Sequence, residues 1–206
     1  TLFINRIDNR KFYDLSFNFN SFKIDLYLSS ETIQSLNIEC STGNINIQNG
    51  FTFTNVDISS STGSININSN VTNNLFLDND TGNIKISNCD KMGNIDIDTD
   101  TGNISLSNVN ANKLEIETDT GDTRLTNTIL KEDLNIDGST GSVYFDGFDA
   151  ANIYIELSTG DVKGTILSNK FFVAKSNTGK VIVPQTREGG ECIIIVDTGD
   201  INIKYK

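Results

Sequence analysis

The chain of 206 residues contains no histidine, a single proline and three cysteines. Without histidine it lacks the commonest metal ligand and the commonest general base of enzymes. Cys40, Cys89 and Cys192 are odd in number and have no paired spacing, so we expect buried small side chains rather than a disulfide framework. A cysteine nucleophile would also lack its usual histidine partner. The sequence therefore predicts no catalytic, cofactor-binding or metal-ligating residue.

Positive charge is scarce as well. Lys and Arg number 16 against 27 Asp and Glu, which gives a formal net charge of -11 and makes nucleic acid and anionic membranes poor partners. No stretch approaches the roughly 18 to 20 apolar residues that cross a bilayer, so no direct membrane insertion is expected. No signal peptide is visible. The many Asn and Ser residues suit an extracellular β protein, and we expect an extracellular or cell-envelope location, with any tether outside this chain.

What the chain does contain is a Thr-Gly dipeptide at nearly constant spacing. It occurs nine times, and successive glycines are 19 or 20 residues apart. The glycines are Gly43, Gly63, Gly82, Gly102, Gly121, Gly141, Gly160, Gly179 and Gly199. A fixed period of this length indicates a solenoid, in which each repeat buries its apolar face against its neighbours.

Apolar residues occupy fixed positions around each Thr-Gly. Pairs stand seven and five residues before the glycine, as in Leu36 and Ile38, and two and four after it, as in Ile45 and Ile47. Alternation with polar residues predicts two half-buried strands per repeat. A looser third apolar position follows seven or eight residues after the glycine, at Phe51, Val71, Cys89, Val109, Ile129, Phe148 and Leu167. Asn precedes it at Asn49, Asn88, Asn108 and Asn127, where stacked amides can form a hydrogen-bonded ladder.

Two all-β architectures fit this pattern. An antiparallel β-meander sandwich would need Thr-Gly hairpins, whose turns require a positive φ at the first loop residue, which β-branched Thr disfavours. A type II corner instead places the positive φ at Gly. We therefore predict a single-domain β-solenoid of about nine coils over residues 15–206, and the meander stays the alternative.

The two ends of the solenoid are predicted separately. Residues 15–35 fit a degenerate first coil, and residues 1–14 are expected to cap it. At the other end a cap is either missing or supplied by another chain. Cys40 and Cys192 fall in the first and last Thr-Gly coils, so stacking separates them too far for a disulfide.

Acidic side chains alternate with the buried pair before each glycine and should stack into a stripe on one outer face. Its members stand four or six residues before the glycine: Glu39, Asp78, Asp98, Glu117, Asp137, Glu156, Asp57, Asp96 and Glu115. Stacked carboxylates repel one another, so a basic partner or weakly bound Ca²⁺ could relieve the stripe. The alternative is a solvated face that discourages aggregation. The equivalent position after the glycine is neutral to basic, as at Lys85, Arg124 and Lys163, which favours side-by-side or end-to-end self-association.

Asp residues also flank the corners, as at Asp100 and Asp122, where they are expected to cap backbone N–H groups. The repeat around Gly179, with Lys180 and Phe171, departs from the acidic pattern and predicts a different local surface.

An enzymatic role is not favoured. Stacked acids offer carboxylate pairs in many coils, so no single pair is distinguished as a glycosidase site. Coils of 19 or 20 residues leave no insertion to wall a cleft. We predict a non-enzymatic binding or spacing module, and a carbohydrate-active β-solenoid enzyme, a lyase or glycosidase, is the alternative.

The motif Ser41-Thr42-Gly43-Asn44-Ile45-Asn46-Ile47, repeated as far as Asp197-Thr198-Gly199-Asp200-Ile201-Asn202-Ile203, resembles the bacterial β-strand-repeat family of suggested adhesins, also called the toast-rack domain. The resemblance covers roughly residues 15–206. It implies β-solenoid-like stacks in bacterial surface or envelope proteins, with an unidentified surface protein or glycan as partner. It implies no catalytic or binding residues.

Overall fold

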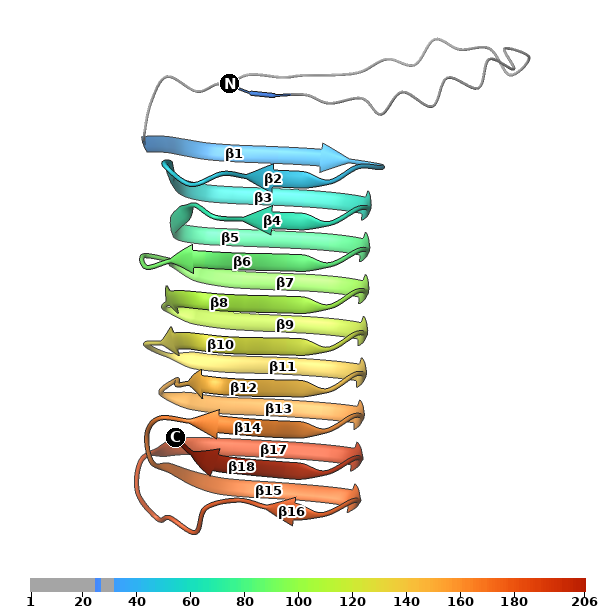
Figure 1. Cartoon of the computed structure of the whole chain (residues 1–206), viewed down its shortest axis with the longest axis vertical. Helices are drawn as coiled ribbons and strands as arrows, with labels where there is room; N and C mark the ends of the chain where they lie inside the picture. The colour runs from blue at the N-terminus through green and yellow to red at the C-terminus, as the bar shows by residue number, and fades with distance from the viewer. Residues whose placement is uncertain (1–24, 27–31) are drawn as a thin grey trace, which may run out of the picture.

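The computed structural model describes residues 25, 26 and 32–206, which form a rod of stacked coils (Figure 1). Two nine-stranded sheets face each other along the rod, and every strand pairing within them is parallel. This confirms the β-solenoid and excludes the antiparallel meander. The predicted cap at 1–14 lies outside the described residues, as does most of the predicted first coil at 15–35.

Sheet A holds the strands before the Thr-Gly corners. They are β1 (Thr32–Cys40), β3 (Thr52–Thr62), β5 (Asn70–Thr81), β7 (Asn94–Thr101), β9 (Lys113–Thr120), β11 (Asp133–Thr140), β13 (Asn152–Thr159), β15 (Lys170–Thr178) and β17 (Gly190–Thr198). Sheet B holds the strands after the corners. They are β2 (Ile45–Ile47), β4 (Ile65–Ile67), β6 (Ile84–Cys89), β8 (Ile104–Ala111), β10 (Thr123–Leu130), β12 (Val143–Phe148), β14 (Val162–Ile166), β16 (Val181–Ile182) and β18 (Ile201–Tyr205).

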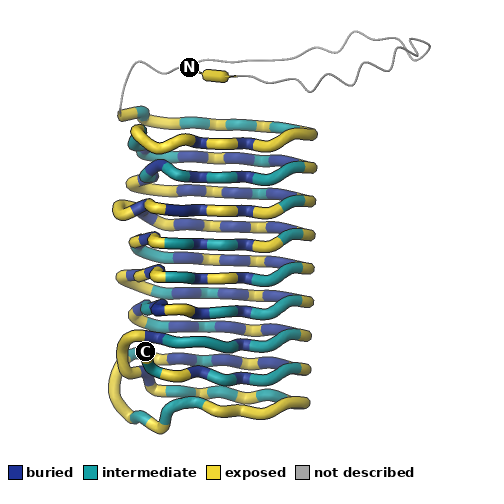
Figure 2. The backbone as a smooth tube through the Cα atoms, in the orientation of Figure 1, coloured by how far each residue is buried: buried dark blue, intermediate teal, exposed yellow. Residues whose placement is uncertain are grey.

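The apolar positions on both sides of the corner point into the space between the sheets and make one continuous core (Figure 2). In the middle of the rod these side chains are fully buried, as at Leu77, Ile97 and Leu106. The position three residues before each glycine also points inward, although it holds polar residues in several coils. Asn79 and Thr99 are buried there, and the Thr99 hydroxyl donates to the Asn79 carbonyl at 2.7 Å. The sequence pattern did not predict this polar file inside the core.

The Thr-Gly corners stack directly on one another along one edge of the rod. Each corner glycine has a positive φ, between 137° and 157°, well beyond the roughly +80° of a type II turn, so the predicted turn type is wrong although the sign of φ is right. The backbones also approach closely. The Gly102 N–H donates to the Thr120 carbonyl at 2.9 Å, and a Cβ on Gly121 would lie 1.9 Å from the Gly102 carbonyl oxygen.

The second corner is less regular. Asn88, Asn108 and Asn127 have φ values of 46–58°. The Asn108 amide donates to the Asn88 side-chain oxygen at 3.1 Å, and the Asn127 amide donates to that of Asn108 at 3.2 Å, which is the predicted Asn ladder. The third apolar position is only partly confirmed. Ile129 is 36% exposed and Leu167 is 49% exposed. In the coil of Ile129 the neighbouring Thr128 takes the buried position, in register with Val109.

The last two coils are exchanged in space. β17 lies between β13 and β15, and β18 lies between β14 and β16, so the rod ends on β15 and β16 and not on the C-terminal coil (Figure 1). Cys192 therefore lies in the second coil from the end, and the expectation that it belongs to the terminal coil is wrong. The coil of β17 and β18 has five buried apolar side chains, Cys192, Ile194, Val196, Ile201 and Ile203. Placing that coil inside the rod buries them on both sides.

Candidate functional site

The predicted acidic stripe lies on the outer face of sheet A, and the strand register stacks its members. Along the position four residues before the glycine, Asp78, Asp98, Glu117, Asp137 and Glu156 pair in unbroken succession across β5 to β13. We call these five residues the acidic ladder. Ser59 separates Glu39 from the ladder, and Ile195 follows Glu156.

The neighbouring column, six residues before the glycine, is less continuous. Asp96 and Glu115 are register partners, but Phe76 separates Asp57 from them. Asn135 follows Glu115 on the next strand. The structure therefore brings most of the predicted stripe together in the middle of the rod, where Asp96 and Glu115 lie beside the acidic ladder. Glu39 is left apart, whereas Asp57 is interrupted only in its own column and its charge still helps to raise the pKa of Asp78.

The carboxylates in this region are not fully neutralised by the protein's own cations. Partial burial, together with the charges of Asp98 and other nearby acids, raises the pKa of Asp78. The pKa of Asp96 is raised by burial and by the charge of Glu115. Lys113 lies nearby and bonds Glu115 at 2.8 Å, which raises the pKa of Lys113. Among the described residues, this lysine offsets part of the charge of one column, and no ion pair involves a carboxylate of the acidic ladder.

Neutralising Asp78 or Asp96 by Asp→Asn is expected to stabilise the rod slightly at neutral pH. A carboxyl whose folded pKa is raised disfavours the native state above that pKa, and the penalty disappears as the pH falls through it. We expect an increase of a few tenths of a kcal/mol in the free energy of unfolding at low salt, since like charges opposite each other in a sheet are mildly destabilising. Urea unfolding at neutral and acidic pH measures it.

Asp161 is the matched control, because the Lys163 ammonium and the Asp200 N–H hold the pKa of its carboxyl below its usual value. Asp161→Asn should therefore leave the stability at neutral pH unchanged or lower. An equal gain for all three variants would show that net charge alone, and not the position of the acids, sets the effect.

The outer face of sheet B carries the neutral to basic column, as predicted. Arg124 and Tyr144 are register partners, and the Arg124 guanidinium lies 4.5 Å from the centre of the Tyr144 ring. Lys163 follows on the next strand and bonds Asp161. The two outer faces of the rod therefore differ in charge in its middle coils.

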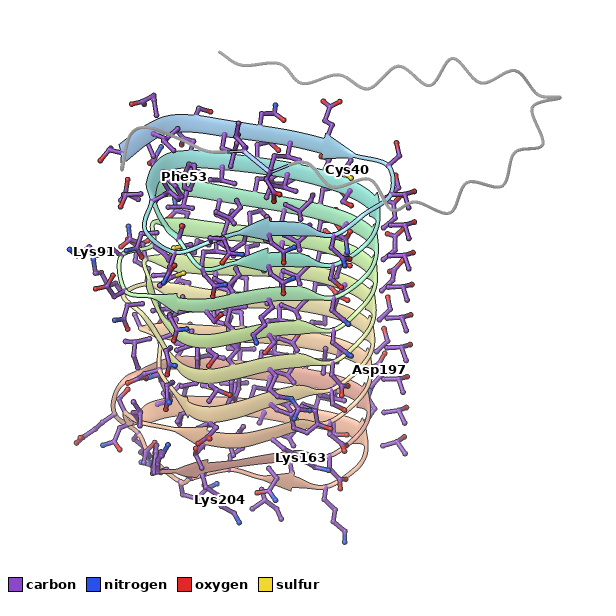
Figure 3. The ribbon with its side chains drawn as sticks, turned by 45° about the horizontal axis from the view of Figure 1, so that its top comes forward. Cys40, Phe53, Lys91, Lys163, Asp197 and Lys204 are labelled. Carbon is purple, nitrogen blue, oxygen red and sulfur yellow. The ribbon has the colours of Figure 1, made fainter. Side chains whose placement is uncertain are left out.

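The polar residues after the corner glycine form their own ladder. Asn83 accepts from the Asn103 N–H at 2.9 Å, Asn103 from the Asp122 N–H at 2.9 Å, and Asp122 from the Ser142 N–H at 3.0 Å. The predicted capping is confirmed at Asp122, although its side chain caps the next coil and not its own turn. It is not confirmed at Asp100, whose carboxylate accepts no bond from a described backbone N–H. The corner side chains form a regular file along one edge near Asp197 (Figure 3). Their role is structural.

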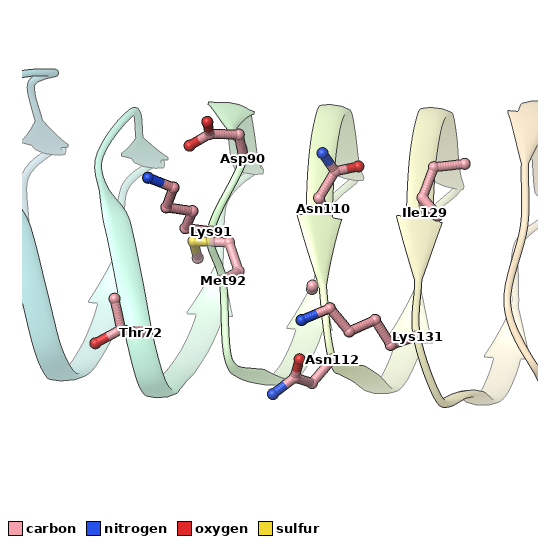
Figure 4. Close-up of a pocket in the computed structure, with 9 residues that line it drawn as sticks. Thr72, Asp90, Lys91, Met92, Asn110, Asn112, Ile129 and Lys131 are labelled. Carbon is pink, nitrogen blue, oxygen red and sulfur yellow. The ribbon is translucent and has the colours of Figure 1, made fainter.

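A shallow groove of about 440 Å³, which the sequence pattern did not predict, lies beside the second corner (Figure 4). Lys91 and Lys131 flank it, and Met92 lies within it, where its sulfur accepts from the Val71 N–H at 3.2 Å. The irregular stretch Asp90-Lys91-Met92-Gly93, which follows the Asn88-Cys89 pair, is the signal that could have indicated it. No carboxylate of the acidic ladder lines this groove.

Two of the three cysteines are buried as predicted. All three are free, Cys89 and Cys192 are buried, and Cys40 is half-buried. Burial raises the pKa of the Cys89 thiol to about 11 and that of Cys192 to about 12, so both stay protonated at neutral pH. Since the thiolate is the reactive form, neither is poised as a nucleophile.

In the part of the chain that the structure describes, no three His, Cys, Asp or Glu side chains lie close enough together to hold a metal ion. Spacing along the acidic ladder is that of neighbouring strands, about 4.8 Å. Among residues 25, 26 and 32–206, no helix is long and apolar enough to cross a membrane.

These features define a class of protein, a two-sheet parallel β-solenoid with an acidic ladder on one face. The model of the Toastrack DUF4097 family matches residues 2–129 and again residues 89–206, and the chain belongs to that family. No curated protein and no solved structure matches the chain. The family is a domain of unknown function, so the function must be argued from the surface itself.

Proposed function

We propose that this chain is a non-enzymatic binding and spacing module of the bacterial cell surface or envelope, and that its acidic ladder binds a cationic partner. The single observation that carries the proposal is the unbroken succession of five carboxylates across β5 to β13, beside Asp96 and Glu115. Register holds these charges together at a cost, since the pKa of Asp78 and that of Asp96 are raised. A basic partner would remove that cost on binding.

The rest of the rod supports the role of a spacer. Nine coils at about 4.8 Å per strand give a length on the order of 40 Å. The core runs without interruption through the coils, so the rod is stiff between its ends. A basic segment of a surface protein suits the ladder best, because an extended basic chain can align with a row of evenly spaced carboxylates. A charged glycan with amino groups would use the same contacts.

Binding of the full chain to immobilised poly-lysine tests the proposal. The variant Asp78→Asn/Asp96→Asn/Asp98→Asn should weaken binding at least about tenfold, since each lost charge contact contributes several tenths of a kcal/mol. Its control, Asp90→Asn/Glu132→Gln/Glu188→Gln, removes the same charge from exposed residues outside the strands of sheet A and should weaken binding much less. Equal losses in the two variants would mean that net charge alone attracts the polycation, and the proposed site would be rejected.

Calcium is expected to compete only weakly. Carboxylates on neighbouring strands offer oxygen ligands, but a Ca²⁺ site needs six to eight of them. We expect millimolar Ca²⁺ to reduce poly-lysine binding no more than an equal ionic strength of NaCl does. Calorimetry with Ca²⁺ alone measures direct binding, and a saturable heat at micromolar Ca²⁺ would show that the ladder is a dedicated metal site instead.

A further inference from the structure

The end of the rod formed by β15 and β16 differs chemically from every other coil. Residues 167–183 contain no acidic residue and three lysines in a chain of net charge -11. Several of its apolar side chains are well exposed: Phe171 is 45%, Val173 49% and Ile182 55% exposed. Surface patches that combine exposed apolar residues with an unusual charge mark interaction sites.

This coil also ends both sheets. β15 pairs with β17 on one side, and β16 pairs with β18 on one side; within the described ranges, neither has a strand on its outer edge. An unpaired parallel edge is a template for another strand. In the other eight coils the position of Lys175 is acidic or uncharged, so the edge combines free backbone groups with a local reversal of charge.

We propose that this end is a homodimer interface, in which two copies meet tail to tail and β15 pairs antiparallel with β15 of the second copy about Val173. A two-fold axis through that position keeps the outward side chains outward and the inward ones inward, so the two cores become continuous. Phe172 then faces Ala174 of the second copy on the inside. On the outside, Val173 faces its own symmetry mate.

The charges of this strand suit a second copy in this register. Phe171 and Lys175 lie two residues on either side of Val173, so each Lys175 faces the Phe171 ring of the other copy and not another lysine. Glu191, on the adjacent strand β17, is the register partner of Phe171 and is exposed. Lys175 of one copy lies across the Phe171 ring of the other copy and therefore reaches toward the Glu191 carboxylate of that other copy. In this register the outward side chains of the strand complement those of a second copy.

Disulfide trapping of the full chain tests the register. In a Cys40→Ser background, which removes the partly exposed native cysteine, Val173→Cys should form a disulfide-linked dimer under mild oxidation, because directly opposed residues of an antiparallel pair have Cβ atoms about 5 Å apart. Asn135→Cys is the matched control, since it occupies the same outward column on β11 in the middle of the rod. It should give no crosslink. Equal crosslinking of both, or none with Val173→Cys, would overturn the proposal.

Analytical ultracentrifugation gives a second, independent measurement. The unmodified chain should form a dimer, and Val173→Asp should weaken it at least about tenfold by placing two carboxylates opposite each other. A monomer at every concentration, or open-ended oligomers that crosslink through Glu39→Cys and Lys175→Cys, would each contradict a tail-to-tail pair. The acidic ladder lies on other coils, so failure of the dimer would leave the proposed binding function intact.

Discussion

Replacing Gly121 by alanine is expected to unfold the middle of the rod. The residue has a φ of 149°, a region that side chains avoid, which costs about 1–3 kcal/mol. An added Cβ would also lie 1.9 Å from the Gly102 carbonyl oxygen, and the stacked, hydrogen-bonded corners leave no room for that carbonyl to retreat. The total loss of unfolding free energy should reach about 4 kcal/mol or more. Circular dichroism during urea unfolding measures it.

Gly43 offers the matched control. It occupies the same corner position with a φ of 137°, but the nearest heavy atom to an added Cβ among the described residues is the Cys40 sulfur, at 3.9 Å. Gly43→Ala should therefore cost only the conformational part, about 1–3 kcal/mol. Similar losses for the two variants would show that φ alone, and not the close approach of successive corners, explains why glycine recurs there.

Replacing Asp149 by asparagine should release the terminal coil of β15 and β16. The Lys170 side chain is 2% exposed, and its ammonium bonds Asp149 at 2.8 Å and also the Ser168 hydroxyl. Removing the negative partner leaves a buried charge without compensation, which costs about 3–5 kcal/mol. Hydrogen exchange should show early loss of protection from Phe172 to Ser176, while the middle of the rod stays protected.

Two comparisons make this expectation specific. Asp146→Asn breaks the ion pair with Lys206 and should cost less than about 1 kcal/mol, because the Asp146 side chain is 65% exposed and the Lys206 side chain 50% exposed. The double variant Asp149→Asn/Lys170→Met removes both charges and should recover most of the lost protection. If Asp149→Asn behaves like Asp146→Asn, the buried ion pair does not hold the terminal coil in place.

Much of the fold could be predicted from the sequence because the repeat is strict. The 19- or 20-residue period, the alternating apolar pairs and the glycine at each corner favoured a stack of parallel coils, and the register of such a stack places Asp78, Asp98 and Glu117 in one ladder. The prediction was wrong where either of two neighbouring residues can take the buried position. At the second corner Ile129 is exposed because the threonine before it takes the buried position, a shift of one residue that hydropathy alone does not reveal.

The polar file inside the core shows a second limit. Asn79 and Thr99 look like surface residues in the sequence, yet they are buried where they bond backbone carbonyls of their own or the neighbouring coil. Gly138, in the same file, makes room for Leu157 of the next coil, whose side chain would lie 2.7 Å from an added Cβ. These buried polar and small residues are accommodated by contacts between coils, and the sequence of a single repeat does not reveal those contacts.

The sequence by itself determined the kind of coil, the number of Thr-Gly repeats and the faces on which charge accumulates, because each depends on spacing within the chain. The order of the last two coils was decided only by the tertiary structure. Every coil presents the same register, so backbone pairing accepts β15 or β17 beside β13 equally well. Side-chain burial chooses between them: the coil of β17 and β18, with its five buried apolar side chains, lies inside, and the basic coil of β15 and β16 lies at the end.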